Sequence, residues 1–556
     1  MKKIILLFST LFVLKSHSQT FGWAKSCGGG SNEQGQGVVV DANGNVYSTG
    51  YFTGSGDFDP GPGTQSLTSA GAEDVYISKL DASGNLVWVK SVGGTGPQRA
   101  WAIALDDSGY VYITGDFNNT CDFDPNAGIA NITSLGGSDI FVLKLNSSGN
   151  YVWAKRMGGS SSETALSIAV DTLGSVLTTG SFNGTADFDP GAGTLSLTSA
   201  GGNDVFISKL NSNGNHIWTK QIGINGTDYG NGITCDLAGN VFVSGVFESI
   251  TDFDPSPATF NLTSAGFTDA FVLKLNANGN FVWAQRMGST STDLSRAITL
   301  DASGNVLSTG EFQGTADFDP GAGSYTLTSA GVRDIYVSKL NPSGNFVWAN
   351  QIGSTANDIG YSLKTDANNN VYVTGTFIGT VDFDPGAGSY TLTSSPSVYD
   401  VFILKLDMNG SFIWAGSCGS TSGDDSYSIF VDPSNNIYAT GFYQGTVDFD
   451  MGTGTFNLTS GGQRDAFVLK LIQGSVTGLD VSTINANIVV FPNPATTQIY
   501  INSESTIETI FIYNLLGEMV QHENINSFSV ENLPVGIYTL QIKTAKGIGT
   551  TRFVKQ

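Results

Sequence analysis

The chain has 556 residues, of which 71 are glycine, 34 phenylalanine and 19 tyrosine, and its formal net charge is −23. This length is too great for one ordinary domain. The excess of acids argues against nucleic acid as a partner, because phosphate binding needs clustered lysine and arginine. Only three histidines occur, which excludes a histidine-rich metal site, and only 13% of residues are charged. This composition is typical of many short strands joined by tight turns.

The first 18 residues have the pattern of an export signal. Two lysines precede an apolar run from Ile4 to Leu14, which is too short to span a membrane. Small serines stand where a peptidase would cut before Gln19. We therefore expect residues 1–18 to be a signal peptide, with a buried N-terminal helix as the alternative. We expect no transmembrane segment in the mature chain.

The four cysteines form no C-x-x-C pair and lie in different sequence contexts. An exported chain of this size with so few cysteines has no disulfide framework. We expect mostly free thiols, with one bridge possible, among Cys27, Cys121, Cys235 and Cys418.

A repeat of about 65 residues dominates the sequence, and a long fixed period indicates a solenoid or a propeller. The string D-F-D-P, or D-F-D-M in the last copy, recurs with the same spacing as a tryptophan. The repeated tryptophans are Trp23, Trp88, Trp153, Trp218, Trp283, Trp348 and Trp414.

Each unit contains four runs rich in β-branched and aromatic residues, bounded by turn residues. In one unit these runs are Trp101 to Asp106, Tyr110 to Phe117, Asp139 to Leu145 and Asn150 to Lys155. Four antiparallel strands repeated seven times predict an all-β fold, a seven-bladed β-propeller over residues 19–471. A β-helix is the alternative, although its coils are usually shorter.

The two ends of the repeat region complement each other. The region begins with a lone fourth strand, Phe21 to Ser26, and its last unit stops after a third strand, Asp465 to Leu471. We expect the first strand to complete the last blade, which would close the ring and remove exposed sheet edges.

Three strings resemble the repeat of secreted bacterial seven-bladed β-propeller proteins (SBBP-type repeats). They are G-N-V-Y-S-T-G at Gly44 to Gly50, D-V-Y-I-S-K-L at Asp74 to Leu80, and G-N-L-V-W at Gly84 to Trp88. The resemblance recurs in all seven units. It implies the propeller fold and export, and no single activity.

The repeated carboxylates have two interpretations. Asp before Pro-Gly caps a turn, but two carboxylates one residue apart are also hard oxygen ligands for calcium. We favour turns and keep calcium as the alternative. The calcium candidates are Asp57, Asp59, Asp122, Asp124, Asp187, Asp189, Asp252, Asp254, Asp317, Asp319, Asp382 and Asp384. The lysine five residues after the first Asp of each third strand should pair with a D-F-D-P carboxylate or an Asp of the next blade.

One face of the propeller should carry the long connections, and it is the better candidate for binding. Equivalent positions on that face are acidic in six repeats: Glu33, Glu163, Asp228, Asp293, Asp358 and Asp424. At the channel mouth the start of the first strand breaks the repeat, and large or charged side chains there could grip a sugar or peptide. The candidate ligand-binding residues are Trp101, Arg296, Tyr361 and Tyr427, with Lys364 three residues beyond Tyr361. Drift in a solvated ring is the alternative.

The period stops after Leu471. Residues 472–487 are a polar linker, and residues 488–556 alternate like the short strands of a small Ig-like β-sandwich. Four strings in this segment closely resemble the type A sorting domain of the type IX secretion system of Bacteroidetes: F-P-N-P-A-T, I-Y-N-L-L-G-E, L-P-V-G-I-Y and R-F-V-K. The motif residues are Pro492, Asn493, Pro494, Gly517, Gly536, Tyr538 and Lys555. This resemblance implies passage across the outer membrane by the secretion machinery.

These observations predict an exported, extracellular or cell-surface binding or adhesion module for a glycan or a protein. No catalytic residue is identified. A carboxylate-based glycan-active enzyme is an alternative, but it requires two acids on the loop-rich face without counterparts in other repeats, and we find no such pair. A calcium-stabilised structural surface protein is the third possibility.

Overall fold

The computed structural model describes residues 19–474, 489–503, 506–514, 519–544 and 547–556. The contacts divide these residues into one unit that ends at Gln473 and a second unit that follows it. All regular elements in the described ranges are β-strands, which confirms the all-β prediction. The predicted signal peptide and most of the predicted linker lie outside the described residues.

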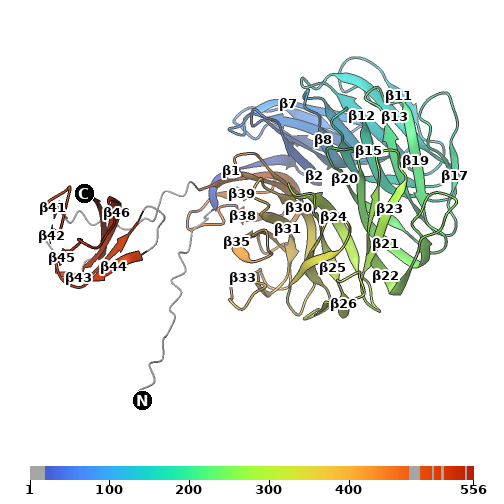
Figure 1. The fold of residues 1–556 in the computed structure, drawn as a ribbon. Coiled ribbons are helices and arrows are strands. Elements are labelled where there is room, and N and C mark those ends of the chain that lie inside the picture. Colours follow the sequence, from blue (N-terminus) through green and yellow to red (C-terminus); the bar gives the residue numbers. More distant parts are fainter. Residues whose placement is uncertain (1–18, 475–488, 504–505, 515–518, 545–546) are drawn as a thin grey trace. The chain divides into compact units, whose positions relative to one another are not determined.

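The first unit, as far as it is described, contains seven sheets of four long antiparallel strands (Figure 1). The first strands are β2 (Glu33–Val40), β8 (Gln98–Leu105), β14 (Glu163–Val170), β20 (Tyr229–Cys235), β24 (Leu294–Leu300), β30 (Ile359–Thr365) and β36 (Asp425–Val431). The second strands are β3 (Val46–Phe52), β9 (Val111–Phe117), β15 (Val176–Phe182), β21 (Val241–Asp252), β25 (Val306–Phe312), β31 (Val371–Phe377) and β37 (Ile437–Tyr443).

The third strands are β6 (Asp74–Leu80), β12 (Asp139–Leu145), β18 (Asp204–Leu210), β22 (Asn261–Leu275), β28 (Asp334–Leu340), β34 (Asp400–Leu406) and β40 (Asp465–Gln473). The fourth strands are β7 (Leu86–Gly94), β13 (Tyr151–Gly159), β19 (His216–Ile222), β23 (Phe281–Met287), β29 (Phe346–Ile352), β35 (Phe412–Cys418) and, from the N-terminus, β1 (Gln19–Gly29). The sheets are therefore assembled in the strand order that the sequence predicts.

The first strands of successive sheets contact one another in a cyclic order, which gives a propeller-like arrangement (Figure 1). β2 contacts β8, the contacts continue through β14, β20, β24, β30 and β36, and β36 contacts β2. These junctions explain the small residues of the first strands. A β-carbon added to Gly37 would lie 2.8 Å from a methyl carbon of Ile103 in the next sheet, so a larger side chain would push the two strands apart.

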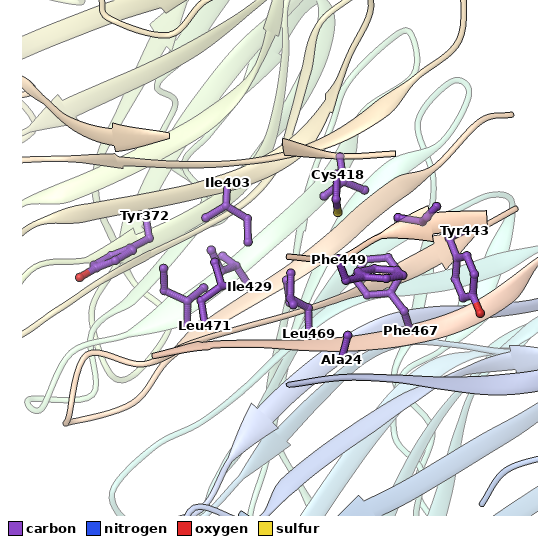
Figure 2. Close-up of a cluster of buried hydrophobic side chains, with 14 residues drawn as sticks. Ala24, Tyr372, Ile403, Cys418, Ile429, Tyr443, Phe449, Phe467, Leu469 and Leu471 are labelled. Atoms are coloured by element: carbon purple, nitrogen blue, oxygen red, sulfur yellow. The ribbon is translucent and has the colours of Figure 1, made fainter. Parts of the chain in front are cut away.

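The N-terminal strand pairs with the end of the repeat region. β1 lies antiparallel to β40, with Gln19 opposite Gln473 and Cys27 opposite Ala466. In the core cluster of Figure 2, Ala24 from β1 lies among side chains of β40 such as Phe467. The strand extends through Ile472 and Gln473, which the sequence assigned to the linker, because Thr20 and Gln19 of β1 provide their hydrogen-bonding partners.

The repeated tryptophan and lysine side chains connect neighbouring sheets. Trp153 Nε1 and Lys144 Nζ both donate to the carbonyl oxygen of Ser212 in the next sheet, each at 3.1 Å. The predicted pairing of these lysines with D-F-D-P carboxylates or with an Asp of the next blade is wrong: Lys209 and Lys339 form ion pairs with Asp171 and Asp301, which are turn residues of their own sheets, at 2.9 and 2.8 Å. Lys144 instead lies 4.8 Å from the Tyr112 ring centroid, so an aromatic face and a backbone carbonyl surround its ammonium group.

The D-F-D-P segments form turns that close small hairpins. Asp187 Oδ1 accepts the backbone N–H groups of Asp189 and Leu195, at 3.0 and 2.8 Å. Phe188 is buried between these polar groups, 5.1 Å from the Phe182 ring. The carboxylates therefore act as turn caps, whereas a metal-binding role stays a prediction.

The hairpins have their own short strands in six repeats, and in the fourth repeat they are continuous with β21 and β22. The pairs are β4 (Ser55–Asp57) with β5 (Ser66–Thr68), β10 (Thr120–Asp122) with β11 (Asn131–Thr133), β16 (Thr185–Asp187) with β17 (Ser196–Thr198), β26 (Thr315–Asp317) with β27 (Thr326–Thr328), β32 (Thr380–Asp382) with β33 (Thr391–Thr393), and β38 (Thr446–Asp448) with β39 (Asn457–Thr459).

The second unit contains two sheets that share one core. One sheet consists of β41 (Val489–Phe491), β42 (Gln498–Asn502) and β45 (Ser527–Ser529), and the other of β44 (Met519–Glu523), β43 (Ile507–Tyr513), β46 (Gly536–Thr544) and β47 (Gly547–Lys555). Ile499 and Phe528 of the first sheet pack in one cluster with Ile510, Leu540 and Phe553 of the second.

All four cysteines lie in the described part of the chain and are free thiols, and three of them are buried. Burial raises the pKa of the Cys27 thiol to about 12, and nearby carboxylates, Asp465 first, add to this. These thiols are structural side chains in their sheets, with low reactivity expected.

Candidate functional site at the channel mouth

A β-bulge interrupts the first strand of each of the seven described sheets. A bulge leaves one residue without a ladder partner and re-aims its side chain. The bulged residues are Gln36, Trp101, Leu166, Asn231, Arg296, Tyr361 and Tyr427. These are the positions at which the sequence breaks the repeat, so the variation falls on side chains that the ladder does not constrain.

The structure brings the five candidate ligand-binding residues to one cavity. Trp101, Arg296, Tyr361, Lys364 and Tyr427 all line a central opening of about 160 Å³ between the first strands. Ligand binding by these residues stays a prediction. Their arrangement, however, is that of a channel whose mouth is ringed by the bulged side chains.

Trp101 is held by a carboxylate from the neighbouring strand. Its Nε1 donates to Asp116 Oδ1 at 2.5 Å, and the hydroxyl of Thr164 in the next sheet donates to the same oxygen at 2.9 Å. The ring of Tyr51 meets the indole edge-on at 5.8 Å. Asp116 is only 9% exposed, and this burial raises its pKa, although the two donors oppose the shift.

A pocket of about 680 Å³ lies beside Trp101, among the loops between sheets. Its wall includes Trp101, Asp116, Asn183, Asn203 and Tyr229, together with several serines. The Asn203 amide donates to the Tyr229 hydroxyl at 2.8 Å, which holds both groups at the wall. An aromatic side chain next to fixed hydroxyls and amides is a surface that suits a polyhydroxylated ligand.

A second cluster occupies the other part of the mouth. Arg296 binds Glu311 through two hydrogen bonds of 3.1 and 2.7 Å, and its guanidinium lies 5.6 Å from the Tyr361 ring centroid. Tyr361 meets Tyr427 edge-on at 5.0 Å, and the Tyr427 hydroxyl donates to Asp425 at 2.9 Å. These side chains are therefore fixed before any ligand arrives.

Asp116, Glu311 and Asp425 were missed by the sequence analysis, which found no acids without counterparts on this face. Asp116 and Glu311 share a position where the other repeats carry Tyr51, Ser181, Val246, Thr376 and Phe442. The signal was present in the alignment of the repeats, on the second strand for Asp116 and Glu311 and on the first strand for Asp425. Each of the three acids is hydrogen-bonded to a bulged side chain of its own sheet.

Lys364 lies deeper than the other four candidates. It also lines a larger opening of about 650 Å³ at the short-turn end of the channel, near Asp106 and Phe430. Burial lowers the pKa of its ammonium group. Its equivalents in the other repeats are uncharged: Val39, Ala104, Ala169, Thr234, Thr299 and Phe430.

The six acids assigned to the loop-rich face are not part of an exposed binding surface, which corrects the sequence interpretation. All are buried at the junctions between sheets; Glu163, for example, is 1% exposed. They accept hydrogen bonds from backbone N–H groups of neighbouring segments, as Glu163 does from Gly159 at the end of β13. The side chains point into the junction because the strand begins there.

The sorting motif converges at one edge of the second unit. Asn493 Nδ2 donates to the Arg552 carbonyl at 3.1 Å, and its Oδ1 accepts the Val554 N–H at 2.9 Å. The Tyr538 hydroxyl donates to the Pro534 carbonyl, and its ring stacks on Phe553 at 5.5 Å. The first and last motif strings are thus joined by direct hydrogen bonds, whereas Gly517 lies outside the described residues.

Two family models match the chain. Residues 489–556 match the secretion system C-terminal sorting domain, and residues 217–246 match the beta-propeller repeat. The chain therefore contains a β-propeller repeat and a C-terminal secretion sorting domain. The sorting domain indicates that the protein is exported across the outer membrane by the type IX secretion system, to the extracellular space or the cell surface. This export requires contact with the secretion machinery. No helix that could cross a membrane occurs among the residues with described positions.

Curated relatives of this propeller repeat protein are distant and longer. A WD repeat-containing protein of Acanthamoeba polyphaga mimivirus is 23% identical over 77% of this chain and 36% of its own length. The regulatory protein FlaEY of Caulobacter vibrioides is 23% identical over 52% of this chain and 30% of its own. The chain thus spans about a third of the length of the curated relatives it matches.

Solved structures show only a weak likeness. The WD40 domain of Neurospora crassa Pan2 is 9% identical, with 64% of this chain and 92% of that chain covered and a TM-score of 0.29. A Bacteroides caccae protein is 10% identical, with 61% and 89% covered and the same TM-score. TM-scores of this size do not establish a common fold.

Proposed function

We propose that residues 19–473 form a closed seven-bladed propeller that acts as a non-catalytic binding module outside the cell. The cyclic contacts of the first strands and the pairing of β1 with β40 support closure. In this proposal the C-terminal unit is an Ig-like sandwich that delivers the propeller through the secretion machinery and is then removed, with release or surface attachment of the propeller.

The ligand that the site supports best is a glycan. The observation that carries this proposal is Trp101, the tryptophan outside the repeated set, which lines both the channel mouth and the adjacent pocket. Its N–H is held by Asp116, so the ring is fixed in place and can stack on a sugar at little cost in side-chain entropy.

Adjacent side chains on β14 support a non-catalytic role. Thr164 reaches Asp116, and successive residues of a strand point to opposite faces. Glu163 therefore points away from Asp116, although both residues lie in the pocket wall. The three mouth acids Asp116, Glu311 and Asp425 are each hydrogen-bonded to a bulged side chain of their own sheet. This supports a structural role for them rather than the acid pair that glycoside hydrolysis needs.

A glycan array probed with the full chain and with Trp101→Ala tests the proposal. Loss of the aromatic face should weaken retention by about tenfold, since stacking contributes roughly 1.4 kcal/mol. Leu173→Ala is the control, because Leu173 is 83% exposed on the short-turn face. Equal retention by the parent chain and Trp101→Ala would remove this site, and retention of a protein partner alone would replace the ligand class.

Calcium binding at the D-F-D-P segments is the second candidate function. The Oδ1 atom of Asp187 is used by the turn, and its Oδ2 accepts no hydrogen bond from the described residues, so an oxygen ligand is left over. A melting temperature that rises with calcium and falls with a chelator would support this structural role. An unchanged melting temperature would leave the carboxylates as turn caps.

A further inference from the structure

One position at the start of each first strand has four kinds of hydrogen bonding. All seven side chains there are buried. The equivalent residues are Glu33, Gln98, Glu163, Asp228, Asp293, Asp358 and Asp424. The backbone around these residues repeats from sheet to sheet. Differences in their hydrogen bonds therefore depend mainly on the length of each side chain and on whether its terminal atoms donate or accept.

Asp293 represents the first kind. Its Oδ2 accepts the Ser289 N–H at 2.5 Å, and its Oδ1 accepts the Gln313 N–H at 3.0 Å. Asp358 and Asp424 have the same two backbone donors. Both oxygens act as acceptors, which is the pattern that an ionised carboxylate requires. Asp228 keeps only one of these donors, the Glu248 N–H to its Oδ1 at 3.0 Å, and its Oδ2 is buried without a partner among the described residues.

Gln98 represents the second kind. Its Oε1 accepts the Gly94 N–H at 2.9 Å, and its Nε2 donates to the Asn118 carbonyl at 3.1 Å. This longer side chain therefore reaches past the N–H donors to a carbonyl oxygen. One atom of the terminal group must be an acceptor and the other must be a donor.

Glu163 has the same length and strand register as Gln98. Gln98 lies opposite Phe117 and Glu163 opposite Phe182, so the carbonyl equivalent to that of Asn118 belongs to Asn183. Glu163 Oε2 accepts the Gly159 N–H at 2.9 Å, as Gln98 Oε1 accepts its own donor. Glu163 Oε1 is buried and has no hydrogen-bond partner among the described residues. A carboxylate oxygen cannot bind a carbonyl oxygen, because neither group carries a proton.

Glu33 repeats this geometry in the first sheet. It lies opposite Phe52, and its Oε2 accepts the Gly29 N–H at 3.0 Å. Its Oε1 is again buried, and no described residue hydrogen-bonds to it. The carbonyl equivalent to that of Asn118 belongs here to Thr53.

We propose that Glu33 and Glu163 are neutral carboxylic acids in the folded protein, and that each donates its Oε1–H to a backbone carbonyl, that of Thr53 and Asn183 respectively. The proton takes the place of the amide hydrogen of Gln98. A buried acid that keeps its proton near neutral pH makes these two sheet junctions sensitive to pH.

The surrounding charges favour the protonated form. Asp139 of β12 faces Glu163: a β-carbon on Gly158 would lie 2.5 Å from the Asp139 carboxyl carbon and 2.8 Å from Glu163 Oε2. The cation nearby, Arg156 of β13, pairs with Asp139 at 3.5 Å. Burial raises the pKa of Glu163 to about 7, and Asp139 adds to the shift, while the Gly159 N–H opposes it.

Glu33 has a similar electrostatic environment. Asp465 of β40 and Cys27 of β1 face it, and a β-carbon on Gly28 would lie 2.6 Å from the Asp465 carboxyl carbon and 2.8 Å from Glu33 Oε2. Burial raises its pKa to about 7, with a further contribution from Asp465. The Gly29 N–H opposes this shift.

The direction of the pH effect follows from these values. The folded pKa is about 7 and the ordinary value is 4.5. The stabilisation is therefore complete below pH 4.5 and is lost as the pH rises through 7. Over that interval the folding equilibrium constant falls by up to about tenfold per pH unit for each glutamate. Since Glu163 also lines the pocket beside Trp101, the proton leaves this part of the wall uncharged.

The test is Glu33→Gln combined with Glu163→Gln in the full chain, with urea unfolding measured from pH 4.5 to 8. The double variant should fold, because the second sheet already has a glutamine, Gln98, at this position. Its unfolding midpoint should vary less with pH than that of the parent, by up to about tenfold in the folding equilibrium constant per pH unit for each glutamate replaced. The infrared absorption of protonated carboxyl groups near neutral pH should decrease in the same variant.

Two further variants sharpen the result. Gln98→Glu should add a pH dependence of the same sign, whereas Asp293→Asn should lose stability at every pH, because an amide NH₂ would face a backbone N–H. The proposal would be overturned if the unfolding midpoint of the double variant had the same pH dependence as that of the parent. It would also be overturned if the double variant were less stable than the parent at every pH, as is expected of Asp293→Asn. A calcium-dependent shift of the parent's midpoint that is lost in the double variant would replace the proton by a cation at these junctions.

Discussion

The indole nitrogen of Trp153 donates a hydrogen bond to the carbonyl oxygen of Ser212 at 3.1 Å, across the junction of two sheets. Lys144 donates to the same oxygen, so one carbonyl receives two donors. The pattern recurs around the unit, for example from Trp283 and Lys274 to the Pro342 carbonyl. Neighbouring sheets are therefore joined by directed polar contacts in addition to apolar packing.

Trp153→Phe should destabilise the protein by about 1 kcal/mol, since it removes one hydrogen bond and keeps an aromatic ring. Trp153→Ala should cost about 3 kcal/mol, because it also removes packing against the turn at Gly214. Urea unfolding of the two variants measures the difference. Equal losses would show that the ring packing is unimportant.

Ala24→Asp should destabilise the protein by about 3 kcal/mol or more, because it buries a charge without a partner. Ala24 is 1% exposed and packs in the cluster with Phe467 and Leu469 (Figure 2). Thr20→Asp, an exposed position on the same strand, should have almost no effect. Thermal melting of both variants is the measurement, and a parent-like Ala24→Asp would show that β1 does not complete the last sheet in solution.

Arg296→Met should cost about 2 kcal/mol, because Glu311, whose side chain is 0% exposed, would lose its two-point partner. Arg333, at 3.5 Å from the same carboxylate, limits the loss. Adding Glu311→Gln should recover part of the stability. A double-mutant cycle by urea unfolding checks this, and strictly additive effects would contradict the coupling.

Asp187→Ala should cost about 1 kcal/mol, because two backbone N–H groups lose their acceptor. Asp187→Asn should cost much less, since it keeps the Oδ1 oxygen. Unfolding is measured with calcium and with a chelator. If Asp187→Asn and Asp187→Ala lower the stability equally, and only with calcium present, then the Asp187 carboxylate binds a metal rather than capping a turn.

The cysteine thiols should not react with an alkylating reagent in the folded protein. Burial raises the pKa values of Cys121, Cys418 and Cys235, the last to about 11, so the thiolate is scarce and access is poor. Mass spectrometry should show alkylation only as urea unfolds the chain. Rapid labelling of any one thiol in buffer would indicate local opening of its sheet.

The strands could be predicted from the sequence because seven copies report the same pattern. Period-two alternation and turn residues recur, so random variation cancels and the boundaries agree to within a few residues. The unpaired start and end of the repeat region predicted the partner of β1 for the same reason. A single copy would not have separated these strands from other apolar segments.

The chemistry of individual side chains could not be predicted in this way. Gln98 and Asp293 occupy one repeated position, but a difference of one methylene decides whether the side chain binds one N–H and one carbonyl, as Gln98 does, or two N–H groups, as Asp293 does. The partners of Lys144 depend on where the next sheet places its turn. Both are distances between strands that are remote in sequence, and repeat alignment contains no information about them.

The pairing of Gln19 with Gln473 joins residues 454 positions apart, and this has a consequence for the order of folding. Local hairpins form early because they close short loops, whereas contacts of great sequence separation form slowly. The first strand to be synthesised must therefore wait for the last repeat before its sheet can be completed. Until then both ends of the array remain open edges, so the half-made chain is the form most in need of protection from aggregation.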